Sequence, residues 1–349
     1  MKGTTSTTTT NLLSPNSTTP LVIGTINVRS LADEDDCKQW RLKSFAGDCD
    51  RAGIYCCAVQ EHRMESFDPN SMIQCKPISH GWEFRYTPCE KASIGQKLYG
   101  VGAILSPIAV RQLIEQTSLN SRSIAFHLRA PGRPRTSTTP DKKALSSRPA
   151  SIVCICIYAP AATTPNADQI RDLLYSDVSA YVDTLPKSAH LFICLDSNAM
   201  LRKGDVDCLF SRNPISKHPI ARNAREELID FCNANQLSVA NAQKQKHHSQ
   251  LTTHRRFNGQ CVTLDYILVR KRFRTSVQNV ATRWTQAASD HKLLTIKYKV
   301  RLQVPPPKCN PPANYAILQS DTTLRNNFVE ALLQDIPIGD ATFEDLQPP

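Results

Sequence analysis

The chain has 349 residues, of which 40% are hydrophobic and 21% are charged, proportions typical of a soluble protein with a packed core. Its formal net charge of +11 and its pI near 9.1 favour a polyanionic partner. No apolar run in the sequence approaches the ~18 residues of a membrane span. The N-terminus also lacks the apolar core of a signal peptide, so we expect neither a membrane protein nor a secreted one.

The 13 cysteines are an odd number and include no Cys-x-x-Cys pair. Several lie inside apolar, strand-like runs, where a free thiol behaves as a small hydrophobic group. This pattern argues against a disulfide framework and against a zinc module. We therefore expect a reducing compartment, nuclear or cytoplasmic.

Composition divides the chain into three parts. Residues 1–20 are rich in Thr and Ser without periodicity, which predicts a disordered tail. Residues 21–302 are predicted to form one domain. Residues 303–349 begin with a Pro-rich stretch typical of a stiff linker and continue as an acidic segment with rough helical spacing, which we interpret as a connector.

Within the domain, apolar runs alternate with helical patterns. Strands are predicted at 21–26, 54–60, 82–87, 99–105, 123–129, 151–157, 191–195, 237–242, 262–268 and 293–300. Helices are predicted near 40–49, 166–185 and 221–235. The clearest helix has Asn166 as its N-cap and Pro186 as its stop, with an apolar stripe at Ile170, Leu173, Leu174, Val178, Tyr181, Val182 and Leu185.

Polar side chains accompany several of these strands. The residues in question are Asn27, Glu61, Tyr158, Asp196 and Asn198 after strands, Asp265 inside a strand, and Asp290 and His291 just before the last one. Each alone could be an ordinary turn or surface residue. Together they predict one pocket, because strand ends are a common place for an active site.

The chemistry of these side chains suits phosphodiester hydrolysis. Glu61 and Asp290 are hard oxygen donors of the kind that Mg²⁺ prefers, with Mn²⁺ as a possible substitute. Asp265 could orient the His291 ring, and a charged ring could contact a phosphate. The catalytic roles that remain are water activation by Asp196 and stabilisation of negative charge by Asn27, Asn198 and Tyr158.

Two segments carry a concentration of positive charge. Residues 244–274 contain eight Lys or Arg and three His against only Asp265. Residues 121–150 contain seven Lys or Arg against only Asp141. Their part from 130 to 150 is a loop rich in Pro, Ser and Thr that we expect to be mobile. This second segment could touch a phosphate backbone or remain a solvated surface loop.

The motifs GTINVRSL, AVQEHR, YGVGAIL, IYAP, LDSN, LDYILV and SDHKLL follow one another over about residues 21–300. In this order they resemble the endonuclease/exonuclease/phosphatase (DNase I-like) superfamily, and most of all the apurinic-type endonuclease domain of non-LTR (LINE-type) retrotransposons. The resemblance implies an α/β (α+β) fold, a four-layer sandwich of two packed mixed β-sheets flanked by helices. It also implies the site roles given above.

From the resemblance and the basic segments, we expect DNA contacts from Arg29, Arg63, Thr253, Arg255 and Arg256. Two motifs depart from the family pattern. The usual Gly-Asp-Phe-Asn is here Leu195-Asp196-Ser197-Asn198, and the usual Thr-Trp is Thr253-His254.

These features predict a metal-dependent endonuclease that nicks double-stranded DNA, bound through its phosphate backbone, and leaves 3′-hydroxyl ends able to prime reverse transcription. The domain is expected to be a monomer, and the acidic connector would lead to a reverse transcriptase domain that this chain does not contain. Two alternatives stay open. One is a catalytically weakened DNA-binding derivative; the other is a phosphatase or phosphodiesterase acting on a small phosphorylated or lipid substrate.

Overall fold

The computed structural model describes residues 20–32, 40–91, 97–130, 150–211, 213–214, 219–300 and 321–335. The chain divides into two compact units, Met1–Gln303 and Val304–Pro349, and the described part of the second is helix α6 (Thr322–Asp335) with Asp321 before it. Most of the expected N-terminal tail, of the basic loop after residue 130 and of the Pro-rich linker lies outside the described residues. Within the described ranges, no helix has the length and apolar character needed to cross a membrane.

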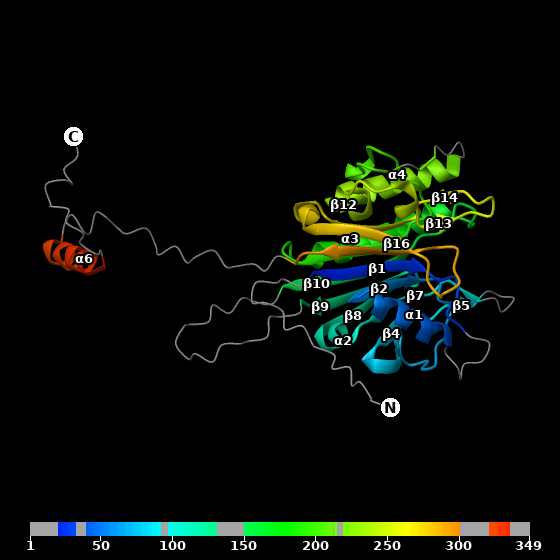
Figure 1. Cartoon of the computed structure of the whole chain (residues 1–349), viewed down its shortest axis with the longest axis horizontal. Coiled ribbons are helices and arrows are strands. Elements are labelled where there is room, and N and C mark those ends of the chain that lie inside the picture. The colour runs from blue at the N-terminus through cyan, green and yellow to red at the C-terminus, as the bar shows by residue number, and fades with distance from the viewer. Residues whose placement is uncertain are drawn as a thin grey trace, which may run out of the picture. The chain divides into compact units, whose positions relative to one another are not determined.

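The first unit is built on two mixed β-sheets (Figure 1). One sheet has seven strands in the order β16-β17-β1-β2-β7-β4-β3, and the other has six in the order β12-β15-β11-β10-β9-β8. The strands of the first are β1 (Leu21–Asn27), β2 (Cys56–Gln60), β3 (Gln74–Pro77), β4 (Glu83–Thr87), β7 (Val101–Leu105), β16 (Val277–Arg283) and β17 (Leu293–Tyr298). Those of the second are β8 (Leu113–Asn120), β9 (Ser123–Arg129), β10 (Ser151–Tyr158), β11 (His190–Asp196), β12 (Leu237–Val239) and β15 (Asp265–Arg270).

Each sheet contains one parallel pair at its centre, β1 with β2 and β10 with β11, and all the other pairs are antiparallel. Two short hairpins, β5 (Glu90–Lys91) with β6 (Lys97–Leu98) and β13 (His254–Arg255) with β14 (Cys261–Val262), lie outside these sheets. The parallel pairs matter for function because their C-terminal ends reach the same edge of the molecule.

Helices cover the outer faces of both sheets and complete four layers. Helix α1 (Trp40–Arg51) packs Leu42 and Phe45 onto the seven-stranded sheet. Helices α3 (Ala167–Thr184) and α4 (Pro219–Ala234) pack apolar side chains such as Val178 and Leu228 onto the six-stranded sheet. The short α2 (Pro107–Gln112) follows β7, with Ser106 as its N-cap. In Figure 1, α4 lies at the top of the view and α1 towards the bottom.

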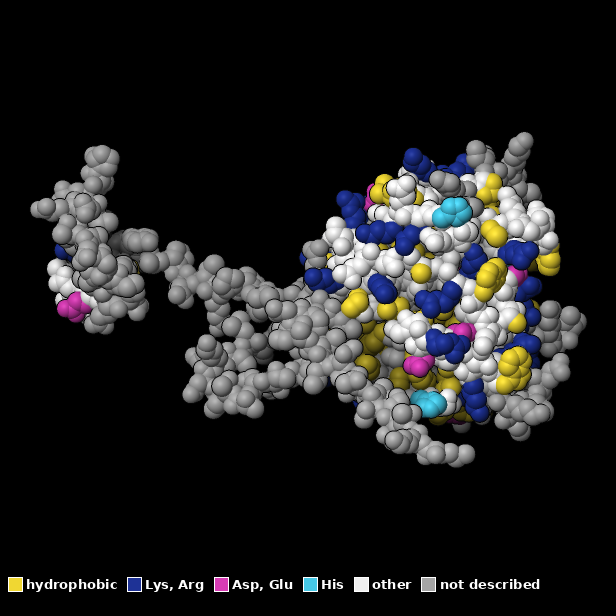
Figure 2. Space-filling model, viewed as in Figure 1, with side chains coloured by type: hydrophobic (Ala, Val, Ile, Leu, Met, Phe, Trp, Pro, Cys, Tyr) yellow, Lys and Arg dark blue, Asp and Glu magenta, His cyan; other side chains and the backbone are white. Residues whose placement is uncertain are grey.

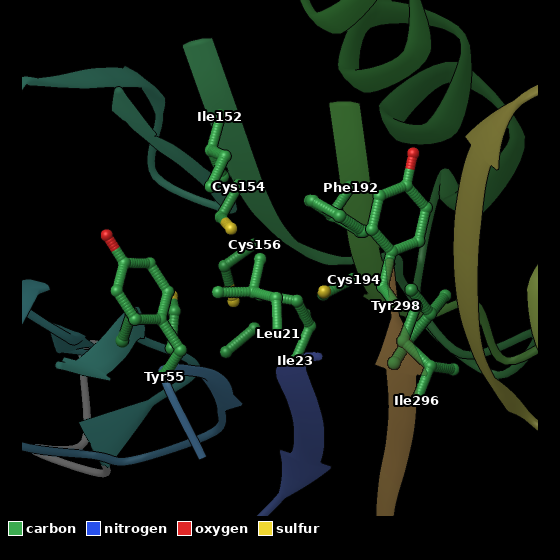
Figure 3. Close-up of a cluster of buried hydrophobic side chains, with 14 of the residues drawn as sticks. Leu21, Ile23, Tyr55, Ile152, Cys154, Cys156, Phe192, Cys194, Ile296 and Tyr298 are labelled. Carbon is green, nitrogen blue, oxygen red and sulfur yellow. The ribbon is translucent and has the colours of Figure 1, made fainter. Parts of the chain in front are cut away.

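The core between the sheets explains the continuous apolar runs in the sequence. Along β10, Ile152, Cys154 and Cys156 face the opposite sheet, while Val153 and Ile155 face the helices, so both sides of the strand are buried. Figure 3 shows the thiols of the inter-sheet layer among aliphatic and aromatic side chains such as Leu21, Ile23, Phe192 and Tyr298. The cysteines of this layer are free, as the composition predicted.

The structure corrects several details of the expected elements. Asn166 does occupy the N-cap of α3, but in the left-handed conformation and without a capping side-chain hydrogen bond. In the expected apolar stripe, Leu173 is 68% exposed, while the buried positions include Arg171, which pairs with Asp168 and Glu227. An arginine can occupy that inner face because α4 supplies a carboxylate opposite it, a contact that helical spacing does not reveal.

Strand limits also differ. The strand expected at 54–60 begins at Cys56, and that expected at 262–268 is broken, since β14 ends at Val262 and β15 begins at Asp265. The sequence 237–242 is strand only over Leu237–Val239 and then turns into a 3-10 helix. Edge strands β3, β8 and β16 were not predicted, because their mixture of polar and apolar residues reflects faces that are partly exposed.

Candidate active site

The predicted catalytic side chains come together at the edge where the parallel strand pairs end. Asn27 ends β1, Glu61 follows β2, Tyr158 ends β10 and Asp196 ends β11. The antiparallel β15 brings Asp265 directly opposite Asp196 in the sheet register. Because the two sheets are packed face to face, residues far apart in sequence come within hydrogen-bond distance of one another.

The carboxamide of Asn27 links the two sheets. Its Nδ2 donates hydrogen bonds to Glu61 Oε1 at 2.8 Å and to Asp196 Oδ2 at 2.9 Å. Its Oδ1 accepts from the backbone N–H of Arg29 at 2.9 Å, which fixes the orientation of the amide. Asn27 therefore sets the distance between the carboxylates of the two sheets.

Asp265 and His291 form a buried carboxylate and imidazole pair, with Nδ1 of the ring 2.9 Å from Oδ2 of Asp265. Burial alone would lower the pKa of His291, but the Asp265 charge and hydrogen bond, with Asp196 and Asp290 nearby, raise it to about 9. The ring therefore carries its proton at neutral pH. Oδ1 of Asp265 is buried and has no hydrogen-bond partner.

The pKa of Asp196 lies close to neutral pH. Burial, and then the charge of Asp265, raise the pKa of Asp196 to about 7, against the opposing effects of His291 and of the Asn27 hydrogen bond. A carboxylate with a pKa close to the working pH is well suited to accept a proton from water.

Asp290 lies among positive groups. Its Oδ2 is 3.0 Å from Nη1 of Arg29 and 3.4 Å from Nε2 of His254, while its Oδ1 is buried without a partner. Burial alone would raise the pKa of Asp290, but the His254 hydrogen bond and the charges of His291 and Arg29 lower it to about 2. Asp290 is thus fully ionised.

The backbone around Glu61 is strained. Arg29, Glu61, Arg63 and Asn198 all have positive φ values, at 56°, 53°, 56° and 51°, in the left-handed region that non-glycine residues rarely adopt. Such residues persist where the surrounding structure holds them, and they cluster at functional sites. Arg63 also pairs with Glu61, with Nη2 3.1 Å from Oε2.

His62 is the anchor of that strained segment. Its Nδ1 accepts from the backbone N–H of Met64 at 3.0 Å, and its Nε2 lies 3.1 Å from the carbonyl oxygen of Thr87. The fully buried ring rests against Gly100, where a Cβ atom would lie only 2.5 Å from it. Burial lowers the pKa of His62 to about 3, so the ring stays neutral, and its two hydrogen bonds fix the backbone next to Glu61.

The unusual Leu195-Asp196-Ser197-Asn198 sequence is well accommodated. Leu195 is a buried strand residue of β11 and needs no glycine conformation. Ser197 is buried and its hydroxyl donates to Leu264 O at 2.8 Å. The backbone N–H of Asn198 donates to Asp196 Oδ1 at 3.2 Å, and its side-chain amide donates to Ala159 O at 3.0 Å. The turn therefore stays hydrogen-bonded without the family's Gly and aromatic residue.

Tyr158 belongs to a stack that sequence reasoning missed. The guanidinium carbon of Arg122 lies 3.7 Å from the ring centre of Tyr99 and 5.3 Å from that of Tyr158. Arg122 is buried and its Nη1 has no hydrogen-bond partner. Burial first, and then Glu61 and Asp196, raise the pKa of Tyr158 far above its ordinary value, so the phenol remains a neutral donor. In the sequence, Arg122 appeared only as one of the seven basic residues of 121–150, just before a predicted strand.

Thr253 and His254 lie next to Asp265, Asp290 and His291. Thr253 is buried, and its hydroxyl accepts from the backbone N–H groups of Leu264 and Asp265, each at 3.1 Å. Its side chain thus positions Asp265, and its expected contact with DNA stays a prediction. His254, which the sequence only marked as a departure, lies against the His291 ring at 4.5 Å between centres and contacts Asp290.

Arg255 and Arg256 adjoin the site on the β13–β14 hairpin. The backbone N–H of Arg255 donates to Asp290 O at 2.9 Å, which ties the hairpin to the site. Beside them is a cavity of about 330 Å³, whose lining includes Arg29, Arg255, Arg256, Phe257 and Trp284. Phe257 is fully exposed and Trp284 half exposed, so this cavity combines positive charge with aromatic surface.

The carboxylate and imidazole groups of the site are of the types that bind a divalent cation. Among the described residues, two groups of three have ligand atoms within 4.8 Å of one another: Asp196, Asp265 and His291, and His254, Asp290 and His291. Glu61 belongs to neither group and approaches Asp196 through Asn27. The expected pairing of Glu61 with Asp290 stays a prediction, supported by the unpartnered Oδ1 of Asp290.

Comparison with known proteins gives the fold. The structure is similar to AP endonuclease LMAP from Leishmania major, with a TM-score of 0.58 and 14% identity over 81% of this chain and 89% of that one. It is also similar to the 3′ phosphatase NExo from Neisseria bound to product DNA hairpin, with a TM-score of 0.51 and 16% identity over 80% of this chain and 100% of that one. The chain thus has the DNase I-like α/β sandwich, and the predicted fold class is confirmed.

Sequence comparison is less specific. No family model matches the chain. Craniofacial development protein 2 from Tragulus javanicus is 31% identical over 169 residues, and that from Bos taurus 30% over 166 residues, each alignment covering 47% of this chain. The matched segments span little more than a quarter of these relatives, 28% and 27% of their length.

The burial of neutral His62 predicts acid sensitivity. In the unfolded chain, His62 has a pKa near 6.5 and binds a proton below that pH. In the folded chain, His62 stays neutral down to about pH 3, so between these values acid favours the unfolded chain. The free energy of unfolding should therefore fall by up to ~1.4 kcal/mol per pH unit over this window from His62 alone. Denaturant titrations at pH 7, 6, 5 and 4 on wild type and His62→Gln should show a shallower loss in the variant.

The matched control for that experiment is His80→Gln, because His80 is exposed. It should retain the wild-type pH dependence. A His62→Gln protein whose stability falls with acid as steeply as wild type would contradict the neutral, buried state of His62.

Proposed function

We propose that this chain is a metal-dependent phosphodiesterase that nicks double-stranded DNA and leaves a 3′-hydroxyl and a 5′-phosphate. The observation that carries the proposal is the Asn27 amide, which joins Glu61 of one sheet to Asp196 of the other beside the Asp265 and His291 pair. Hydrolysis of a phosphodiester needs water activation, charge stabilisation and an oriented phosphate, and this edge supplies a group for each.

Each residue has one role in this proposal. Glu61 and Asp290 would hold a divalent cation, Mg²⁺ or Mn²⁺, which when bound neutralises charge on the phosphate oxygens. Asp196 takes a proton from the attacking water, for which its pKa near 7 suits it. The water oxygen bonds to phosphorus as the bond from phosphorus to the 3′ oxygen breaks, and that oxygen leaves as a hydroxyl with a proton from solvent. His291, protonated and oriented by Asp265, donates to a phosphate oxygen. Tyr158 and Asn198 are neutral donors for the charge that develops on the phosphorus centre.

The likeness of the fold to an AP endonuclease and to a 3′ phosphatase that was bound to a DNA hairpin supports a DNA substrate in general terms. The cluster of Arg255 and Arg256 next to Asp290 favours a polyanion over a small substrate, because a single phosphate would need fewer cations. In an element that encodes a reverse transcriptase, the 3′-hydroxyl product would serve as its primer. A small-substrate phosphatase and a non-cutting DNA-binding protein are the outcomes that the following tests would favour instead.

The first test concerns the bond that breaks. Asp196→Asn and His291→Ala should each lower the rate of supercoiled plasmid nicking by ~10²–10⁴-fold and leave DNA affinity nearly unchanged, because both residues act on the transition state. Nicked product should be extended by a DNA polymerase without phosphatase treatment. Asp172→Asn, an exposed residue of α3, is the control and should cut at the wild-type rate. An Asp196→Asn enzyme with wild-type activity, or ends that cannot be extended, would refute this mechanism.

The second test concerns the metal. EDTA should abolish nicking, and added Mg²⁺ should restore it in wild type but not in Glu61→Gln, whose activity should be lower by about a hundredfold or more. Glu115→Gln, on the exposed part of β8, removes a carboxylate elsewhere and should behave as wild type. Full activity in EDTA would remove the metal from the proposal.

The third test concerns DNA binding. If Arg255 and Arg256 contact phosphates, the double change to Gln should weaken binding to all duplexes alike. It should also reduce the slope of log affinity against log salt by about one for each phosphate that is no longer neutralised. Arg111→Gln on α2 has the same kind of charge change on another surface and should leave the slope intact. Affinity that is independent of salt, together with hydrolysis of inositol phosphates or sphingomyelin, would favour the phosphatase alternative.

A further inference from the structure

Arg270 is a buried cation outside the proposed active site that the structure leaves unsatisfied. It ends β15 and is only 6% exposed, and its Nε and Nη2 atoms are buried without any hydrogen-bond partner. Buried guanidinium groups are normally paired, because an unpaired buried charge is costly. Burial, and then the neighbouring Arg272, lower the pKa of Arg270, while the charge of Asp183 opposes them.

Arg270 lines a cavity of about 330 Å³ where β15 meets the last turns of α3 and α4. The charged side chains of its lining are Arg270, Lys271, Arg272, Lys187 and Asp183. The one carboxylate is 77% exposed and lies 3.9 Å from Nζ of Lys187. The lining therefore carries an excess of positive charge, and Figure 2 shows Lys and Arg side chains gathered on the part of the surface where Figure 1 draws β12.

This cavity is remote from the proposed active site. Asp265 begins β15 and Arg270 ends it, and five steps along a strand correspond to roughly 17 Å. Arg270 and the catalytic carboxylates therefore lie at opposite ends of the same sheet, and one bound phosphate cannot contact both.

We propose that this cavity is a second anion-binding site, which takes the phosphate group of a small phosphorylated molecule or of a nucleic-acid strand through Arg270, Arg272 and Lys187. The planar guanidinium group of Arg270 offers parallel N–H donors that match phosphate oxygens. The proposal is independent of nuclease activity, because it uses none of the residues of the site at the other end of β15.

A purely structural role for Arg270 is the alternative to be tested. The cavity includes Asp183 near the end of α3 and Ala234 at the end of α4, and helix C-termini attract cations. In that case, changing Arg270 would alter stability without altering the response to an anion. Binding measurements separate the two roles.

The experiment is calorimetric titration of the full chain with inorganic phosphate, against chloride at equal ionic strength. Arg270→Met and Lys187→Gln should each weaken phosphate binding about tenfold, since each removes a charge-assisted hydrogen bond. Asp183→Asn should tighten it, because the substitution removes the one negative charge of the lining. Lys43→Gln, an exposed position of α1, should leave affinity unchanged.

Lys187 and Asp183 are both exposed, so their variants remain informative even if Arg270→Met fails to fold. Any phosphate bound at the proposed active site contributes equally to wild type and to the Arg270, Lys187 and Asp183 variants, so it does not affect their comparison. The same phosphate affinity in wild type and in these three variants would overturn the proposal, as would equal binding of chloride.

A second arm identifies the source of the phosphate, with Asp196→Asn as the background to prevent cleavage. Short single-stranded oligonucleotides with a 5′-phosphate or a 5′-hydroxyl are titrated into proteins with and without Lys187→Gln. Weaker binding of both oligonucleotides in the variant indicates a backbone phosphate. An effect on the phosphorylated one alone, or on inorganic phosphate alone, indicates a terminal or free phosphate group.

Discussion

The packing of β1–β2 against β10–β11 is the constraint on which the site depends. Each parallel pair ends in polar side chains at the same edge, and the inter-sheet layer of aliphatic and thiol groups sets how far apart those ends lie. Asn27 then spans the gap with hydrogen bonds to Glu61 and Asp196. A large change in the volume of the inter-sheet core would alter this spacing, because a close-packed core transmits such changes. In this fold, the packing of the inter-sheet core therefore determines the geometry of the site.

The site brings several carboxylates together at one edge, which costs electrostatic free energy. The neighbouring residues offset this cost to different extents for Asp196 and Asp290. His291 and the Asn27 amide favour the ionised form of Asp196, yet burial and Asp265 raise its pKa to about 7. Asp290, which lies between Arg29 and His254, is held in the opposite state, with a pKa of about 2. Two aspartates at the same edge therefore suit different tasks, one as a proton acceptor and the other as a permanent negative charge. Neutral His62, through its hydrogen bonds to Met64 and Thr87, fixes the backbone next to Glu61 without adding charge.

The two ends of β15 differ in a way that bears on function. At its start, Asp265 is paired with His291 and its backbone N–H is bonded to Thr253. At its end, Arg270 has buried donors without partners beside an open cavity. A buried oxygen without a hydrogen-bond partner is tolerated in an active site where a cation or substrate binds. By the same reasoning, the buried N–H donors of Arg270 without partners indicate a place where an anion binds. Positive charge in residues 244–274 thus lies near both ends of β15, whereas the sequence presents it as a single basic segment.

Local patterns in the sequence were enough to predict the order of most strands along the chain, including the apolar strands β10 and β11, and to single out the polar residues at strand ends. A strand buried on both faces displays its environment directly in a run of apolar residues. The folded chain was needed to show that Thr253 turns inward to position Asp265, that Arg171 is buried against Glu227, and that His254 and Arg122 belong to the site. Each of these depends on a partner distant in sequence. Hydrophobic periodicity reports whether a position faces a core, but it cannot report which charge or ring lies across from it.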